Sequence, residues 1–145
     1  MKIAKALKRK NKLVKELNVL LNRVQSYNSI IEGKKRAYST KDSLIKSKEK
    51  LEELVDLKTK ISKANIPIQD KIYRLSELKS MVSHLKNVST QEGPSDEGYL
   101  GRDDKVVNYS AEISTTEKDE LVLELEKNIE EIQEELDSYN YTTEI

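Results

Sequence analysis

The chain has 145 residues, of which 36% are apolar and 36% charged, and its 26 basic and 26 acidic residues leave no net charge. It holds no Cys, Phe or Trp, which excludes disulfides, thiolate catalysis and zinc–thiolate sites and is typical of long charged helices with thin aliphatic seams. No secretory signal pattern is readable and the longest aliphatic run has three residues, so we expect a cytoplasmic protein without membrane spans.

The charges are divided between the two ends of the chain. Residues 1–50 hold fifteen Lys and Arg against four Asp and Glu, a net charge of +11, whereas residues 101–145 hold four against fourteen, a net charge of −10. A basic arm is one signature of nucleic-acid or anionic-lipid binding, but here the acidic end supplies a counterion within the same sequence. We expect the two ends to pack side by side, within one chain or between chains, because flanking charges commonly select the partner in coiled coils.

Two apolar rows predict one continuous helix over about residues 2–31. The first row steps by four and three from Ile3 to Ile31, and the second repeats every seven residues from Ala6 to Tyr27. A single helix cannot bury such a face, so the rest of the chain or a second copy must cover it. A polar residue on the first row would fix the helical register. The expected buried seam is Leu7, Val14, Leu17, Leu21, Val24 and Asn28.

Basic side chains off this apolar face, and those in the loop that follows Gly33, are candidates for anion binding. A free basic face would suit phosphate groups, although three basic residues in a loop more often form a solvated turn. The candidates are Lys5, Lys8, Arg9, Lys12, Lys34, Lys35 and Arg36.

Two shorter helices are predicted over residues 40–65 and 69–88. Ser39 and Asp42 form an approximate capping box before the first, and Pro67 prevents it from continuing. The only histidine, His84, lies seven residues from Glu77 on the second helix, about 10 Å away, so this pair predicts no acid–base centre.

The next stretch, residues 89–105, is a long irregular loop whose carboxylates, Asp96, Glu97, Asp103 and Asp104, lack the spacing of a calcium loop. Residues 106–113 then alternate between apolar and polar types and predict a short strand, with Val107, Tyr109 and Ala111 on its apolar face. The only partner we identify within the chain, residues 98–102, contains two glycines and makes a poor strand. We therefore expect this strand to contact its equivalent in a second subunit.

The last helix is predicted over residues 115–138, with Leu125, Ile129 and Ile132 in its seam. It is followed by the hexapeptide Asn140-Tyr141-Thr142-Thr143-Glu144-Ile145, which no helix rule explains.

This hexapeptide, the opening run Met1–Leu7, the helix end at Ile61 to Asn65 and the strand before an acidic helix resemble the septicolysin-like family of small bacterial proteins. Tyr141 departs from the pattern, since relatives usually carry Trp there. The resemblance implies a helical oligomer, and it brings no established activity and no catalytic residue. The family name suggests a thiol-activated haemolysin, but the sequence has no Cys, no Trp and no membrane-spanning hairpins.

The sequence thus predicts a mainly α protein of long antiparallel helices in a bundle or coiled coil, with one short β segment before the C-terminal helix, in a single domain spanning residues 1–145. We expect a non-enzymatic, self-associating protein with a structural or protein-interaction role, a dimer or larger homo-oligomer without cofactor or metal. One alternative is a nucleic-acid-binding module that uses Lys15 together with the anion-binding candidates of the first helix and of the loop after Gly33. Another is peripheral membrane or haemolysin-like activity. We expect neither a nucleic-acid nor a membrane partner.

Overall fold

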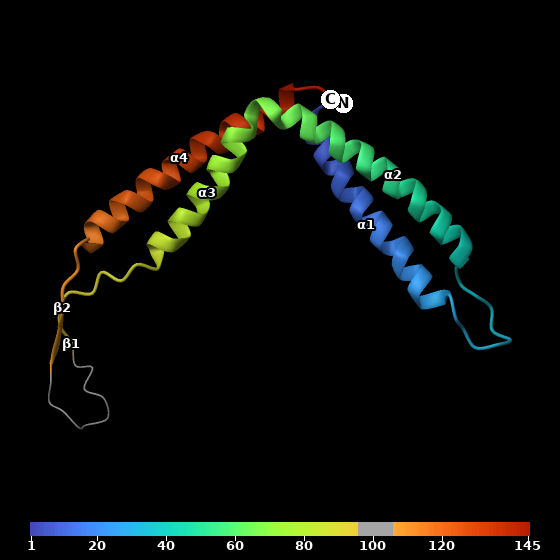
Figure 1. The fold of residues 1–145 in the computed structure, drawn as a ribbon, viewed down its shortest axis with the longest axis horizontal. Coiled ribbons are helices and arrows are strands. Elements are labelled where there is room, and N and C mark those ends of the chain that lie inside the picture. The colour runs from blue at the N-terminus through green and yellow to red at the C-terminus, as the bar shows by residue number, and fades with distance from the viewer. Residues whose placement is uncertain (96–105) are drawn as a thin grey trace. The chain divides into compact units, whose positions relative to one another are not determined.

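The computed structural model describes residues 1–95 and 106–145 and is mainly helical (Figure 1). This confirms the predicted fold class, with a short β segment before the C-terminal helix. The elements, in chain order, are α1 (Ile3–Tyr27), α2 (Thr40–Asn65), the 3-10 helix η1 (Ile66–Ile68), α3 (Gln69–Lys86), β1 (Gly93–Ser95), β2 (Val107–Tyr109) and α4 (Thr115–Thr142).

A single domain was predicted, and contacts between residues divide the chain into two compact units. The first unit comprises Met1–Gln69 and Leu136–Ile145, and the second comprises Asp70–Glu135. Helix α4 supplies residues to both units, so each unit is described separately.

The first unit is built on an antiparallel hairpin of α1 and α2, which run side by side in Figure 1. Its core joins two small or aliphatic side chains of α1 to three aliphatic side chains of α2, and the α1 residues are fully buried. The residues of this core cluster come from α1 and α2 alone, so the cluster is one seam wide. The core residues are Ala6, Leu13, Leu54, Leu57 and Ile61.

Helix α2 has the bounds that its sequence predicted. The Ser39 hydroxyl accepts a hydrogen bond from the backbone N–H of Asp42 at 3.2 Å, so it caps one of the unsatisfied first-turn donors. The helix ends at Asn65, two residues before Pro67, and the chain continues as η1. Capping chemistry at one end and proline at the other thus fixed both boundaries.

Helix α1 ends at Tyr27, four residues earlier than predicted. The Arg36 guanidinium donates from Nε to the carbonyl oxygen of Tyr27 at 2.8 Å and from Nη2 to that of Asn28 at 3.0 Å. These bonds satisfy carbonyl groups that have no partner within the helix. Asn28 is therefore an exposed residue at the helix end, and its predicted place as a buried amide in the seam was wrong.

The C-terminal tail closes the first unit. Helix α4 continues to Thr142, four residues beyond its predicted end, and the Lys2 ammonium donates to the carbonyl oxygen of Thr142 at 2.7 Å. The backbone N–H of Ile3 donates to Thr143 O at 3.0 Å, and Lys2 and Glu144 form an antiparallel bridge. The first three residues of the hexapeptide that no helix rule explained therefore extend α4, and its last residues pair with the first residues of the chain.

The second unit contains α3 and α4 as an antiparallel pair. Ion pairs join Lys71 to Glu135 near one end and Lys86 to Glu126, at 2.8 Å, nearer the other. Val122 of α4 is buried, whereas the predicted seam residues are half-buried because only one helix covers them. Those residues are Leu125, Ile129 and Ile132.

Helix α3 ends at Lys86, two residues before the predicted end. The Lys118 ammonium donates to the carbonyl oxygens of Lys86 at 3.0 Å and Val88 at 2.8 Å. A cation on α4 therefore bonds the last carbonyl group of α3 and one just beyond it, as expected where the helix dipole is negative.

The predicted strand over residues 106–113 is shorter and is paired within its own chain. Strand β2 covers three residues and pairs antiparallel with β1, with Gly93 opposite Tyr109 and Ser95 opposite Val107. The subunit contact predicted through Val107, Tyr109 and Ala111 rested on an unpaired strand, and that premise was wrong. Ala111 lies beyond β2, where its backbone N–H donates to Glu92 Oε2 at 2.6 Å.

The other in-chain partner that we weighed, residues 98–102, lies outside the described residues, as do Asp96, Glu97, Asp103 and Asp104. The strand that does pair, Gly93-Pro94-Ser95, has no alternating pattern and contains a proline, so its sequence did not indicate a strand.

Candidate functional site

The α1–α2 hairpin has two flanks that differ in chemistry, and helix geometry defines them. Lys12 and Val19 come directly before the buried residues Leu13 and Leu20, whereas Val14 directly follows Leu13. Neighbouring residues are turned by about 100° around a helix, so the positions before and after a buried residue lie on opposite sides of the seam. Because the helices are antiparallel, the same rule assigns the same flank in α2.

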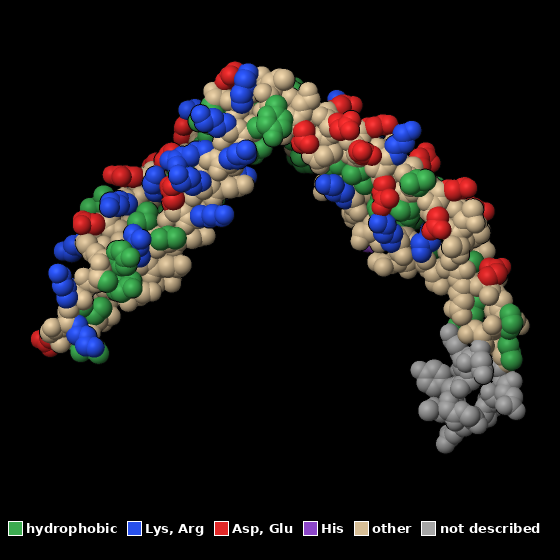
Figure 2. Space-filling model, turned by 180° about the vertical axis from the view of Figure 1, so that it is seen from behind, with side chains coloured by type: hydrophobic (Ala, Val, Ile, Leu, Met, Phe, Trp, Pro, Cys, Tyr) green, Lys and Arg blue, Asp and Glu red, His purple; other side chains and the backbone are tan. Residues whose placement is uncertain are grey.

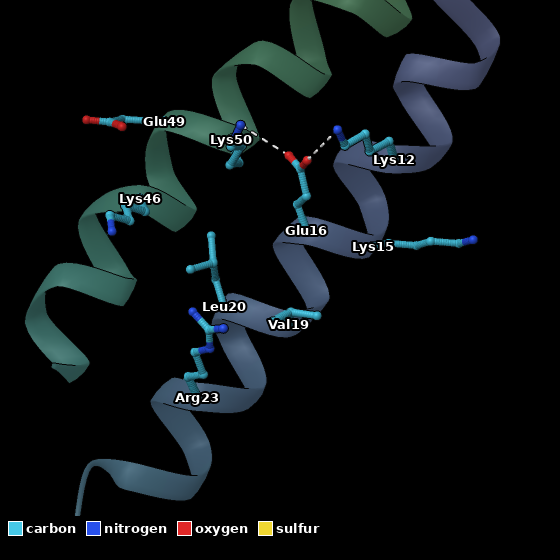
Figure 3. A pocket seen from close by; sticks show the side chains of 9 residues that line it. All are labelled: Lys12, Lys15, Glu16, Val19, Leu20, Arg23, Lys46, Glu49 and Lys50. Carbon is cyan, nitrogen blue, oxygen red and sulfur yellow. Dashed lines mark ion pairs between the residues drawn. The ribbon is translucent and has the colours of Figure 1, made fainter. Parts of the chain in front are cut away.

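One flank carries a hollow of about 520 Å³ between α1 and α2, which we call the basic groove (Figure 3). Its floor is aliphatic and its walls are charged, with five Lys and Arg against two Glu, a formal net charge of +3. The lining residues are Lys12, Lys15, Glu16, Val19, Leu20, Arg23, Lys46, Glu49 and Lys50.

Glu16 is the acidic centre of the basic groove. The Lys50 ammonium lies 3.1 Å from Glu16 Oε2 and Lys12 lies 3.8 Å from Oε1, and Figure 3 shows both turned toward the carboxylate. The contact with Lys50 is the main cause that lowers the pKa of Glu16, and the charges of Arg9 and Lys12 lower it further against the opposing effect of desolvation. Through its ion pair with Lys50, this carboxylate links α1 to α2.

Other cations stand along the rim of the basic groove. The Arg23 guanidinium lies over the Tyr38 ring, 4.1 Å from its centroid. Among the residues that the structure describes, Lys15 and Lys46 have no ion-pair partner within 4 Å. On the face in Figure 2, Lys and Arg are frequent over α1 and α2, whereas Asp and Glu are numerous over α3 and α4.

The opposite flank carries large aliphatic side chains that α1 and α2 leave exposed, and we call it the apolar flank. The exposed fractions rise from 36% at Val14 to 51% at Val55. Leu7 and Leu17 lie at its edge and are half-buried. The residues of the apolar flank are Val14, Leu21, Leu44, Leu51 and Val55.

The two apolar rows of the first helix therefore differ in burial. The second row, represented by Ala6, Leu13 and Leu20, is the one that α2 buries. The first row, predicted as the seam, is half-buried at Leu7, Leu17 and Val24 and exposed at Val14 and Leu21, because α2 covers only one side of the broad apolar face.

The predicted anion-binding residues are scattered rather than gathered. Of them, Lys12 lines the basic groove, as does Lys15 of the nucleic-acid alternative, and Arg36 caps α1. Arg9 donates to Glu53 Oε1 at 2.9 Å from Nε and 2.5 Å from Nη2. The remaining candidates are exposed, namely Lys5, Lys8, Lys34 and Lys35.

Most residues of the basic groove were missed by sequence reasoning. Lys12, Glu16, Val19 and Arg23 step by four, three and four, which is a third row on α1 that the pattern contained. Lys46 and Lys50 belong to α2, and only the antiparallel pairing brings them opposite this row.

The described residues hold no group of three or more His, Asp or Glu side chains arranged to bind a metal ion. His84, whose Nδ1 lies 2.8 Å from the carbonyl oxygen of Ser80, faces its own helix rather than a carboxylate. Within the described ranges, no helix has the length and apolar character needed to cross a membrane. No protein family model, no curated protein and no solved structure matches this chain.

Proposed function

We propose that this is a non-enzymatic, self-associating helical protein with a structural or interaction role, in which the α1–α2 hairpins of two copies pair through their apolar flanks. The observation that carries the proposal is the exposure of five aliphatic side chains on one side of a single hairpin. Water contact at such a contiguous set is unfavourable, and contiguous exposed apolar surface is a common mark of a protein interface.

The spacing of these residues fits a helical partner. Val14 and Leu21 are seven residues apart on α1, as are Leu44 and Leu51 on α2. A seven-residue repeat keeps one face of a helix turned toward a neighbouring helix in left-handed supercoiled packing. Two hairpins that meet on this face would form a four-helix bundle with a two-layered core.

A second copy is the occupant we favour because the apolar flank suits a two-fold contact. In such a contact the same residues of both copies face one another, so the surface must be complementary to itself. Similar Leu and Val side chains along both α1 and α2 meet this requirement. The resemblance to the septicolysin-like family, which implies a helical oligomer, agrees with this proposal and stays a prediction. A chain without Cys also suits the reducing cytosol.

Two neighbouring residues of α2 provide a matched test. Leu44 lies on the apolar flank and is 42% exposed, whereas Ile45 is 58% exposed and lies about 100° further round the helix, away from α1. We expect Leu44→Asp to break the two-fold contact and lower the mass, because the carboxylate would be desolvated without a partner. Ile45→Asp adds the same charge one residue further from the helix N-terminus and should leave the mass unchanged.

Sedimentation velocity at micromolar concentrations measures the outcome, and circular dichroism at 222 nm confirms that each variant keeps its helices. A wild-type protein that sediments as a monomer throughout, or an equal loss of mass in both variants, would refute the proposed contact.

A further inference from the structure

We infer that the basic groove of one copy receives the acidic outer surface of α4 from another copy. This contact lies on the opposite flank of the hairpin from the proposed two-fold contact and does not depend on it. It would link copies head to tail, so that assembly continues beyond a dimer as a ring or an open filament.

The basic groove is complementary to an aliphatic side chain surrounded by negative charge. The lining of the basic groove includes Val19, which is 49% exposed, together with Lys15, Arg23 and Lys46. The basic groove contains two carboxylates, and that of Glu16 already interacts with Lys50 and Lys12. An incoming apolar group would therefore meet an apolar floor, and incoming carboxylates would meet a surplus of cations.

The surface of α4 presents that combination. Leu123 is 68% exposed and lies among four glutamates and one lysine, which give the surface a formal net charge of −3. We call this surface the acidic face, and it consists of Glu120, Leu123, Glu124, Glu126, Lys127 and Glu130.

The two surfaces also match in formal charge and in availability. The basic groove carries +3 and the acidic face −3. Glu126 is already paired with Lys86 at 2.8 Å, whereas Glu120, Glu124 and Glu130 have no ion-pair partner within 4 Å among the described residues. Complementary charge of this kind selects a partner and its orientation and speeds association. Leu123 would supply the buried apolar contact that surface ion pairs alone do not provide.

Paired charge reversals test the inference in the full-length chain. The groove variant combines Lys15→Glu with Lys46→Glu, and the face variant combines Glu120→Lys with Glu124→Lys. We expect each to weaken head-to-tail association by at least about tenfold at low salt, and the chain that carries all four substitutions to recover it. The matched control, Lys34→Glu with Lys35→Glu, makes the same charge change in an exposed loop outside the basic groove and should have no effect.

Sedimentation velocity over a range of concentrations measures the mass of the assembly. Each variant is measured in the wild-type background and in the Leu44→Asp background, which removes the proposed two-fold contact. The inference is supported if the Leu44→Asp protein grows in mass with concentration and this growth falls with added salt. The growth should also be lost in the groove variant and in the face variant, and it should return in the chain that carries all four charge substitutions. Masses unaffected by the groove and face variants would overturn it.

A polyanion is the competing occupant of the basic groove. Fluorescence anisotropy of a labelled single-stranded oligonucleotide, measured at low salt, tests whether the basic groove binds a polyanion. If the groove variant loses oligonucleotide binding while the face variant leaves protein association unchanged, the groove binds nucleic acid and the inference is wrong. If oligonucleotide binding is absent and the charge swap restores assembly, the acidic face of α4 is the occupant.

Discussion

Replacing Leu13 with Ala measures how much of the stability comes from the single seam between α1 and α2. Leu13 is fully buried in the core of the first unit. The change removes three carbon groups, each worth about 0.8 kcal/mol when buried, which gives about 2.4 kcal/mol. The cavity left behind adds a further cost that depends on how far the neighbours relax, and a two-helix seam open on both flanks relaxes readily. We therefore expect a loss of about 3 kcal/mol in the free energy of unfolding.

Ile45→Ala is the control, because it removes the same number of carbon groups from a side chain that is 58% exposed. By the same estimate its cost is about 1 kcal/mol. Urea unfolding followed by circular dichroism at 222 nm gives both values, and a repeat at higher protein concentration separates core loss from dissociation. Equal costs for the two substitutions would mean that Leu13 is not the centre of the core.

Two further predictions concern the tail. The Tyr139 hydroxyl donates to the carbonyl oxygen of Ala64 at 2.9 Å, so Tyr139→Phe should lower the free energy of unfolding by about 1 kcal/mol. The control is Tyr141→Phe, which changes a side chain that is 66% exposed and should leave the free energy of unfolding unchanged. The pKa of Glu144 is lowered from 4.5, first by a hydrogen bond from the N-terminal ammonium and then by one from Lys2. The ionised Glu144 carboxylate therefore contributes to stability above pH 4.5, and this contribution is lost as the pH falls through the lowered pKa. The melting temperature of Glu144→Gln should consequently depend less on pH in this acidic range than that of the wild type.

The helix boundaries that the sequence predicted correctly are those with local chemistry at the boundary. Ser39 and Pro67 mark the limits of α2 without help from the rest of the chain. The end of α1 was misplaced because Ile31 continues the apolar spacing, and the deciding contact is made by the side chain of Arg36, eight residues after Asn28. A pattern of apolar residues cannot anticipate a cap that comes from the following loop.

The candidate site was harder to predict than the helices that carry it. Sequence reasoning identified two apolar rows on the first helix, but the choice of which row α2 buries depends on the fit of side chains such as Ala6 and Leu13. The basic groove depends on the antiparallel register that places Lys50 against Glu16. The partner of β2 was missed because Gly93 and Pro94 pair through the backbone, without a side-chain signal.

The central claim is that the apolar flank of one copy packs against the apolar flank of another. The most direct test is an isotope-filtered NOE experiment on a mixture of labelled and unlabelled chains, which detects only contacts between different molecules. We predict intermolecular NOEs among the methyl groups of Val14, Leu21, Leu44 and Leu51, and none to Ile45. A sample that is oligomeric by sedimentation yet shows no intermolecular NOE to these methyl groups would contradict the account.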